Sequence, residues 1–463
     1  MTSAIEYDVL VLGGGSAGTR AAQTAAERGA RTAMFNDGEL GGLCILRGCM
    51  PTKTMLHAAH LVHEARHHHT RGVGRAAVSV DFAEVMANKD EKVARFKRAK
   101  VAGIENGGYD VIDARARFSG PDTVEAGGQT YRFKSGAVLA TGSVASHLEI
   151  PGIDEVPQFT SDDAMRLEEQ PPSVIVVGTG AIGLELAQFF ARLGTPTTLV
   201  SRRPLLARID PLLSEEAHKA VDAEPNLELL CPYRPVRALR DGDEVVLELD
   251  GPEVGRSVRA AVLLQAIGRE PALDGLGLET AGIAVDANGP VAGDDLRTTN
   301  PRVFVAGDAR GKRLLLHVAN WEGRVAGLNA AEPGATHALD ERLDVDVIFI
   351  DPPMASVGLT EAAAKERDLP VITASARFAE TGRAITQDVT HGAWKIVAAP
   401  SGEILGSQIL GPRADDLIHT VAAVMYYRGT AADLLEMPWY HPTVSEVLLG
   451  LARDLQKQVE SVR

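Results

Sequence analysis

Two cysteines, Cys44 and Cys49, are separated by four residues in a segment that runs on to Lys53. Neighbouring thiols can interconvert between a dithiol and a disulfide, so such a pair can hold two electrons. The chain has 3 cysteines in all, and two of them stand in this segment. The spacing therefore favours a redox-active pair.

Two other interpretations of this pair are a stapling disulfide and a zinc site. A chain of 463 residues can build a large core and does not need a disulfide for stability. Zinc would require a second pair of Cys or His ligands, and the C-x2-C spacing common in zinc sites is absent. The sequence therefore predicts redox chemistry and no metal site at these cysteines.

A dinucleotide-binding pattern precedes the cysteines. An apolar run leads into Gly13, Gly15 and Gly18, which fit G-x-G-x-x-G. The glycines permit a tight turn and let backbone N–H groups approach a pyrophosphate at a helix N-terminus. The surrounding pattern predicts a strand, a helix and a second strand over residues 7–12, 19–28 and 32–35.

The same pattern returns in the middle of the chain. A second apolar run leads into Gly178, Gly180 and Gly183. One such match could be a glycine turn that arose by chance, but two matches in the same context indicate two bound dinucleotides. The predicted elements are a strand, a helix and a strand over residues 173–177, 184–192 and 197–200.

Further apolar strands end at small or acidic residues. One ends at Thr141, Gly142 and Ser143, and another, over residues 303–306, ends at Asp308. A Pro-Gly pair at 151–152 marks a turn and a domain boundary. After about residue 334 the pattern changes to mixed strands and helices, which predicts a third domain with a helix over residues 414–428.

Composition excludes several classes of protein. The hydrophobic share of 45% and the charged share of 24% are those of an ordinary globular protein. The net charge of -15 argues against a nucleic-acid partner. There is no apolar run of about 18 residues to span a membrane, and the first residues lack a basic signal-peptide region. We therefore expect a cytoplasmic location and no membrane partner.

Taken together, these motifs resemble the flavoprotein disulfide reductases, which include dihydrolipoamide dehydrogenase, glutathione reductase and mercuric reductase. The resemblance covers essentially the whole chain. It rests on both fingerprints, the Cys44–Lys53 segment, Ala140-Thr141-Gly142, Gly268-Arg269-Glu270-Pro271, Ala306-Gly307-Asp308 and His441-Pro442-Thr443-Val444-Ser445-Glu446.

The resemblance implies an α/β fold with two Rossmann-like dinucleotide-binding domains and a C-terminal α+β dimerisation domain. FAD would bind the first nucleotide fold and a nicotinamide cofactor the second, in a homodimer with a shared active site. The implied domains are the first part of the FAD domain (1–150), the NAD(P)H domain (151–270), a return to the FAD domain (271–336) and the dimerisation domain (337–463).

The resemblance also implies roles for individual residues. Cys49 would be the thiol beside the flavin and Cys44 the thiol that attacks the substrate. His441 matches the family's acid–base histidine, supplied by the partner subunit, and Glu446 matches the carboxylate that orients it. Lys53 and Glu185 match a pair near the flavin N5 edge. The matched FAD contacts are Gly13, Gly15, Gly18, Asn36, Asp37, Gly42, Lys53, Thr141, Gly142, Ser143 and Asp308.

Two departures from the family pattern bear on the cofactors. At the ribose position of the first fold Asn36 stands before Asp37, and either side chain could bond a ribose hydroxyl. In the second fold the matching residue is Ser201, not an acid, and three arginines follow. A neutral residue among guanidinium groups suits the 2′-phosphate of NADPH, whereas the alternative is a solvated basic turn. The expected NADP contacts are Gly178, Gly180, Gly183, Ser201, Arg202, Arg203, Arg208 and Gly268.

The predicted function is therefore reduction of a small disulfide by NADPH through FAD and the Cys44–Cys49 pair. A dihydrolipoamide dehydrogenase that uses NAD is the alternative. A mercuric-reductase-like enzyme is a further one, although residues 455–463 lack the cysteine pair that such enzymes carry. A redox-sensing flavoprotein without turnover is disfavoured because Cys44, Cys49, Lys53, His441 and Glu446 are all present.

Two remaining features have plainer interpretations. Cys231 has no partner in sequence, so we predict a small buried hydrophobic residue there.

Histidines at 57, 60, 63, 67, 68 and 69 follow the cysteine segment, and spacings of three and four place several on one helix face. They could bind a transition metal, but no carboxylate or cysteine in this stretch completes a ligand set. We therefore predict a partly exposed His-rich helix without a metal.

Overall fold

The computed structural model describes residues 4–462, and the chain divides into two compact units. The first unit comprises residues 1–54, 86–146 and 268–339, and the second comprises residues 55–85, 147–267 and 340–463. Two long helices, α3 (Cys49–His67) and α4 (Phe82–Glu105), each begin in one unit and end in the other. Each unit is described by itself.

The first unit is built on one sheet whose strands run in the order β3-β2-β1-β6-β5-β4, with β17 also paired to β6. The pairs of β1 with β2 and β6 are parallel, as is that of β17 with β6. Apolar residues over most of β1 are fully buried, as the continuous apolar run predicts for a strand covered on both faces. The strands are β1 (Ile5–Leu12), β2 (Thr32–Asn36), β3 (Asp110–Asp113), β4 (Ala116–Gly120), β5 (Thr123–Ala126), β6 (Gln129–Leu139) and β17 (Val303–Val305).

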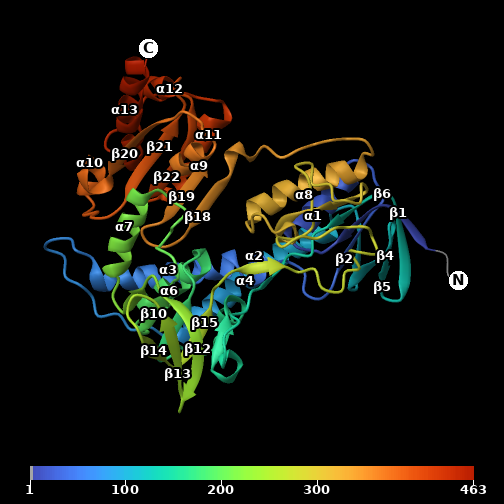
Figure 1. Ribbon diagram of the computed structural model, residues 1–463, viewed down its shortest axis with the longest axis horizontal. Coiled ribbons are helices and arrows are strands. Elements are labelled where there is room, and N and C mark those ends of the chain that lie inside the picture. Colours follow the sequence, from blue (N-terminus) through green and yellow to red (C-terminus); the bar gives the residue numbers. More distant parts are fainter. Residues whose placement is uncertain (1–3, 463) are drawn as a thin grey trace. The chain divides into compact units, whose positions relative to one another are not determined.

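Two helices pack together beside this sheet, α1 (Ser16–Glu27) and α8 (Leu316–Ala331) (Figure 1). Small residues let their backbones approach closely. A Cβ at Gly323 would lie 2.3 Å from the Ala17 carbonyl oxygen, and one at Gly327 would lie 2.5 Å from that of Ala21. The remaining elements of this unit are α2 (Leu43–Leu46), the pair β7 (Ser143–Ala145) with β16 (Arg269–Pro271), and the short helix η2 (Gly307–Arg310).

The second unit contains another parallel sheet, in the order β11-β10-β9-β15-β8, and a three-stranded antiparallel sheet, β12-β13-β14. Helix α6 (Ala181–Leu193) is almost completely buried, and α7 (Pro211–Asp222) follows β10. The strands are β8 (Gln158–Thr160), β9 (Val174–Val177), β10 (Thr197–Val200), β11 (Leu227–Leu230), β12 (Arg234–Asp241), β13 (Glu244–Asp250), β14 (Ser257–Ala260) and β15 (Val262–Gln265), with short helices η1 (Ile153–Glu155) and α5 (Ser161–Ala164).

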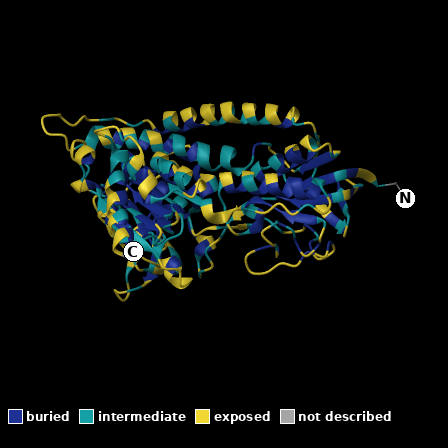
Figure 2. Ribbon diagram, turned by 90° about the horizontal axis from the view of Figure 1, so that it is seen from above, coloured by how far each residue is buried: buried dark blue, intermediate teal, exposed yellow. Residues whose placement is uncertain are grey.

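The last part of the second unit is an antiparallel sheet, β18-β19-β22-β21-β20, packed against helices around the buried Trp394. Figure 2 shows most strands in dark blue, whereas the outer sides of many helices are yellow. The elements are β18 (Val345–Ile348), β19 (Met354–Gly358), β20 (Ile372–Arg377), β21 (Ala393–Ala398), β22 (Ile404–Leu410), α9 (Glu361–Glu366), α10 (Gly382–Ile385), α11 (Ala414–Tyr426), α12 (Ala431–Glu436), α13 (Val447–Val462), η3 (Glu341–Leu343), η4 (Phe378–Glu380) and η5 (Val444–Glu446).

The predicted α/β class, with two similar nucleotide-binding-type folds, is confirmed. Strand β10 has the predicted bounds. Helices α1 and α6 begin three residues before their predicted starts, because Gly15 and Gly180 are their N-cap residues and the fingerprint itself forms the first turn. Among residues 4–462, no helix combines the length and apolar character needed to cross a bilayer.

Candidate active site

The two cysteines lie at the start of neighbouring helices. Cys44 belongs to the short helix α2, and Cys49 is the first residue of α3. Both thiols are half-buried. A hydrogen bond with Cys49, followed by burial, raises the pKa of the Cys44 thiol. The two sulfur groups are therefore coupled, and ionisation of one suppresses ionisation of the other.

The position of Cys49 favours it as the thiolate of the pair. The N-terminus of a helix carries partial positive charge, which stabilises a thiolate there. Helix α3 has 19 residues, so its peptide dipoles add up to a positive end at Cys49, although Pro51 in the first turn has no N–H. Lys53 follows one turn later on the same helix face, and its charge lowers the pKa of Cys44. These charges favour an ionised sulfur in the pair.

Lys100 is a further charged group beside the cysteines that the sequence did not reveal. Its ammonium donates a hydrogen bond of 2.7 Å to Thr19 Oγ1 on α1. Burial lowers the pKa of Lys100, and a charge on Cys44 raises it in turn. Because Lys100 lies on α4, far from Cys44 in sequence, no local motif could have indicated it.

The first fingerprint forms a turn with an open space above it. Gly13 has a φ of +112°, and a Cβ there would lie 2.2 Å from the Ala140 carbonyl oxygen, so only glycine fits. A Cβ at Gly18 would lie 1.8 Å from the Gly13 oxygen. Gly15 has no atom within 4 Å of its Cβ position. This tight turn with an exposed helix N-terminus suits a pyrophosphate.

Gly42 connects the fingerprint to the cysteine segment. It has a φ of +76° and is the N-cap of α2, and its Cβ position lies 3.0 Å from the Gly15 Cα. The turn that would hold the pyrophosphate is thus packed against the residue two places before Cys44. Asn36 ends β2 and donates a hydrogen bond of 2.8 Å to the Gly38 carbonyl, while Asp37 is exposed.

A group of hydrogen-bonded polar side chains forms where β6 and β17 end, at the same carboxyl edge of the sheet as the first fingerprint. Ser143 donates a hydrogen bond of 2.6 Å to Asp308 Oδ2 and accepts one of 2.9 Å from Arg269 Nε. Gly268 precedes β16 with a φ of +132°, and Thr141 Oγ1 bonds the Ala272 carbonyl at 2.8 Å. The structure therefore brings together predicted residues from three separate stretches of sequence, namely Thr141, Gly142, Ser143, Gly268 and Asp308.

Glu322 supports this end of the sheet and was missed by sequence reasoning. It is buried in α8, where its carboxylate accepts hydrogen bonds from the Gly307 N–H at 2.7 Å and from Arg310 at 2.6 Å. Burial raises the pKa of Glu322 despite these partners. It fixes the turn that presents Asp308. No signal in the sequence distinguishes it from other helical glutamates.

The second fingerprint repeats the geometry of the first. Gly178 has a φ of +112°, and its Cβ position lies 2.3 Å from the Ala266 oxygen. A Cβ at Gly183 would lie 1.9 Å from the Gly178 oxygen, whereas Gly180 has no atom within 4 Å of its Cβ position. The two folds therefore offer equivalent helix N-termini for two dinucleotides.

The loop after β10 carries three exposed arginines. Among the described residues, no hydrogen bond or ion pair engages the side chains of Arg202, Arg203 and Arg208. Ser201 is buried instead, with Oγ 2.7 Å from Thr179 Oγ1 and 2.8 Å from the Arg203 carbonyl oxygen. Ser201 therefore shapes the loop, while the guanidinium groups face solvent.

The end of this loop is anchored to the antiparallel sheet. Asp210 is the N-cap of α7 and accepts a hydrogen bond from the Leu212 N–H at 3.0 Å. Its carboxylate also pairs with Lys395, and its N–H donates to Gln408 Oε1 at 3.0 Å. These contacts hold one end of the arginine loop in place.

Cys231 corrects one prediction. It is half-buried and polar in its contacts, because its thiol donates a hydrogen bond of 2.9 Å to the Arg203 carbonyl oxygen. The prediction of a buried hydrophobic residue was wrong because Cys231 directly follows strand β11 and meets the arginine loop at the edge of the sheet.

His441 and Glu446 form the pair expected of an acid–base histidine and its carboxylate. His441 Nδ1 lies 3.1 Å from Glu446 Oε1, and Glu446 Oε2 accepts a hydrogen bond of 2.8 Å from the Thr443 N–H. That N–H and then His441 lower the pKa of Glu446. The His441 side chain is 80% exposed, so its Nε2 side is open to another molecule.

Glu185 is buried on α6 and accepts a hydrogen bond of 2.9 Å from the Phe349 N–H.

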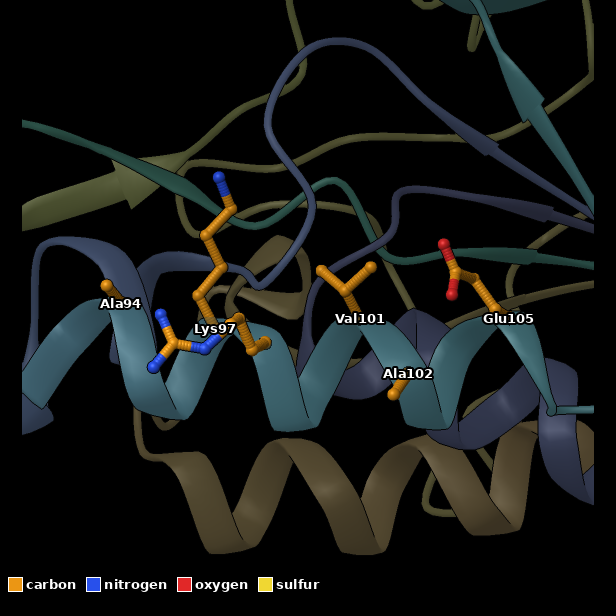
Figure 3. Close-up of a pocket in the computed structure, with 6 residues that line it drawn as sticks. Ala94, Lys97, Val101, Ala102 and Glu105 are labelled. Carbon is orange, nitrogen blue, oxygen red and sulfur yellow. The ribbon is translucent and has the colours of Figure 1, made fainter.

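A shallow hollow on α4 is separate from these residues (Figure 3). Its volume is about 430 Å³, and a single helix supplies all of its lining. None of the predicted site residues lines it, so we assign it no part in the chemistry. The lining residues are Ala94, Lys97, Arg98, Val101, Ala102 and Glu105.

Comparison with known proteins places this arrangement in a family. Residues 7–323 match the model of the pyridine nucleotide-disulphide oxidoreductases, and residues 345–452 match the dimerisation domain of the same family. The chain belongs to the pyridine nucleotide-disulphide oxidoreductases. It is therefore an enzyme of the flavoprotein disulfide oxidoreductase class, a family that binds FAD and a pyridine nucleotide.

Relatives within the family carry different names. A mercuric reductase of Bacillus cereus is 33% identical over 99% of this chain and 73% of its own length. A dihydrolipoyl dehydrogenase of Thermus scotoductus is 34% identical over 98% of both chains. Among solved structures, the HOCl-induced flavoprotein disulfide reductase RclA of Escherichia coli is 25% identical, covers 96% of this chain and 99% of its own, and has a TM-score of 0.84.

Two glycines of the first fingerprint, one open and one packed against the backbone, allow a test of the first nucleotide site. Gly15→Ala should lower FAD content while the melting temperature of the FAD-free protein changes little, since the new Cβ enters empty space. Gly18→Ala should destabilise that protein by about 1–3 kcal/mol, because its Cβ meets the backbone. FAD absorbance and thermal unfolding would measure both. Unchanged FAD content in Gly15→Ala would contradict the binding of FAD at this turn.

Proposed function

We propose that the protein is a homodimeric, FAD-containing enzyme that uses NADPH to reduce a small disulfide substrate. We choose NADPH over NADH because of the residues in the loop after β10. There Arg202, Arg203 and Arg208 are exposed, and no acid occupies the ribose position at Ser201. The proposal of a homodimer is supported by the match of residues 345–452 to a dimerisation domain.

Charge supports this cofactor choice. An acid at the end of the second strand would accept a hydrogen bond from the 2′-hydroxyl of NAD and repel a 2′-phosphate. Guanidinium groups instead form charge-assisted and often bidentate hydrogen bonds with phosphate. The anchoring of Asp210 by Lys395 and Gln408 fixes the loop, which reduces the entropy lost when the phosphate binds.

The proposed reaction is NADPH + H⁺ + RSSR → NADP⁺ + 2 RSH. The chemistry that bound FAD supplies is transfer of an electron pair from the nicotinamide to the Cys44–Cys49 disulfide. The Cys44 thiolate then attacks one substrate sulfur, and the first thiol leaves with a proton from His441 of the partner subunit. Cys49 next attacks Cys44, which releases the second thiol and restores the disulfide. The helix N-terminus at Cys49 and the ammonium of Lys53 favour the thiolates.

Cofactor choice can be tested by removing single guanidinium groups. Each hydrogen bond to a charged group contributes about 1.5–3 kcal/mol, so Arg202→Ala should raise the KM for NADPH by roughly 10- to 150-fold. NADH should be affected little, because it has no 2′-phosphate. Arg208→Ala should act in the same direction, and Ser201→Glu should add repulsion. Steady-state kinetics with both nicotinamides would measure these changes.

Arg237→Ala is the matched control, because this arginine is exposed on β12 and its side chain forms no hydrogen bond or ion pair with any described residue. It should leave both KM values unchanged. A wild-type preference for NADH, or an equal effect of Arg202→Ala on both cofactors, would show that the arginine loop is only a solvated basic turn.

A dihydrolipoamide dehydrogenase that uses NAD is the second candidate. It is supported by the dihydrolipoyl dehydrogenase relative, which matches along its whole length, and by the His441–Glu446 pair. Turnover of dihydrolipoamide with NAD, compared with that of glutathione disulfide with NADPH, separates the two functions. Hg²⁺ belongs in the same substrate panel, since the B. cereus relative is named a mercuric reductase.

A further inference from the structure

A cluster of metal-ligand side chains lies in the second unit, apart from the residues assigned to the redox reaction. His60, Glu64 and Asp351 each offer a ligand atom, and these atoms lie within 4.8 Å of one another. His60 and Glu64 are four residues apart on α3 and therefore share a helix face. Asp351 comes from the turn between β18 and β19, and its Oδ2 lies 3.0 Å from His60 Nδ1.

We propose that His60, Glu64 and Asp351 bind one divalent transition-metal ion of the zinc type. One imidazole and two carboxylates are suitable ligands for zinc, with bonds of about 2.0–2.2 Å and a water in the fourth position. Two ligands of one tetrahedral ion are then about 3.3 Å apart. The His60–Asp351 separation is close to this value, and Glu64 is exposed and can rotate inward.

Asp351 is held firmly by its backbone. Its N–H donates a hydrogen bond of 2.8 Å to Gln188 Oε1, and its carbonyl accepts one of 2.9 Å from Gln188 Nε2. Burial alone would raise the pKa of Asp351, but His60 and Arg192 hold it well below its usual range. A fixed and ionised carboxylate loses little entropy when it binds a cation.

Arg192 is the positive group that would oppose a cation. Its Nη1 lies 2.9 Å from Asp351 Oδ2 and 3.4 Å from His60 Nδ1. However, Arg192 is also paired through Nε and Nη2 with Glu224, at 3.0 and 2.9 Å. His63 Nδ1 lies 3.0 Å from the same carboxylate. The three carboxylates of Glu64, Asp351 and Glu224 outnumber the single guanidinium of Arg192, so the charge of these four side chains favours a cation.

The cluster is distinct from the cysteine pair. His60 lies about three turns beyond Cys49 along α3, so the two groups cannot bind one ion. The inference is independent of the choice between NADPH and NADH. It also changes the interpretation of the His-rich stretch, because a second carboxylate, Asp351, comes from 291 residues away and joins His60 and Glu64.

The test is calorimetric titration of the oxidised, FAD-loaded protein with Zn²⁺, after removal of metals and above the raised pKa of His60. We expect a site with one ion per chain. Loss of a group that only supports a ligand weakens metal binding about 10- to 100-fold. Loss of a ligand itself should cost at least as much, so His60→Ala and Asp351→Asn should each weaken Zn²⁺ binding by at least about 10-fold. Glu64→Gln should act in the same direction, and this exposed position is a safe one for folding.

His57→Ala is the matched control, since His57 is exposed one turn earlier on α3 and lies outside the cluster. It should leave Zn²⁺ affinity unchanged. All variants keep the three cysteines, so any binding to thiols is common to them. Absence of the site in the wild type, affinity that is unchanged by Glu64→Gln and His60→Ala, or an equal loss in His57→Ala would overturn the proposal and leave an ordinary ion-pair network.

Discussion

Replacement of either Cys44 or Cys49 by serine should abolish NADPH-driven disulfide reduction, because a single thiol cannot form the disulfide that receives the electron pair. The two variants should differ in absorbance. If Cys49 is the thiolate beside the flavin, Cys44→Ser should retain or strengthen a long-wavelength absorption band, and Cys49→Ser should lose it. Anaerobic spectra of the purified FAD-loaded variants would measure this difference.

The assignment depends on helix α3, whose first residue is Cys49. Cys231→Ser is the control, since this thiol contacts the arginine loop and is not part of the pair. It should keep both turnover and the absorption band. Loss of the band in Cys44→Ser but not in Cys49→Ser would reverse the roles of the two thiols.

The second large effect is expected at His441. His441→Gln should slow the thiol–disulfide half-reaction by about 10²-fold or more, because a positioned general acid or base contributes about 10²–10⁴-fold. Reduction of the flavin by NADPH should stay near the wild-type rate, since it needs no proton transfer at sulfur. Stopped-flow measurement of the two half-reactions separates these effects.

Glu446→Gln tests whether the carboxylate acts through His441. Glu446 accepts hydrogen bonds from both His441 and the Thr443 N–H, so glutamine keeps an acceptor but removes the charge. The thiol–disulfide step should slow less than in His441→Gln, and its pH profile should move. If His441→Gln slowed both half-reactions equally, the cause would be altered packing between subunits rather than loss of an acid–base group.

Local patterns predicted the parts of the site that depend on short stretches of chain. The glycine fingerprints, strand β10 and the cysteine segment could be predicted because tight turns and buried strands restrict residue type over a few positions. The His441–Glu446 contact also lies within one turn, closed by the Thr443 cap. Spacing and side-chain chemistry were sufficient for the fingerprints and the cysteine pair, whereas the His441–Glu446 pair was expected from the family resemblance.

Residues that act across long sequence separations could not be predicted in this way. Lys100 and Asp351 reach their partners only when distant elements pack together, and each of them, like Glu322, looks like an ordinary surface charge in sequence. The prediction of a buried hydrophobic residue at Cys231 was wrong for a related reason. The average burial of cysteine gave no information about the loop that contacts this thiol. The cofactor choice at Ser201 stays a prediction.

The central claim is that reducing equivalents from NADPH reach the Cys44–Cys49 pair. The direct measurement is alkylation of the oxidised protein before and after anaerobic addition of one equivalent of NADPH, with labelled peptides quantified by mass spectrometry. We predict that Cys44 and Cys49 become labelled only after NADPH, whereas Cys231 is labelled equally in both samples. Labelling of Cys44 and Cys49 that is equal before and after NADPH would contradict the account.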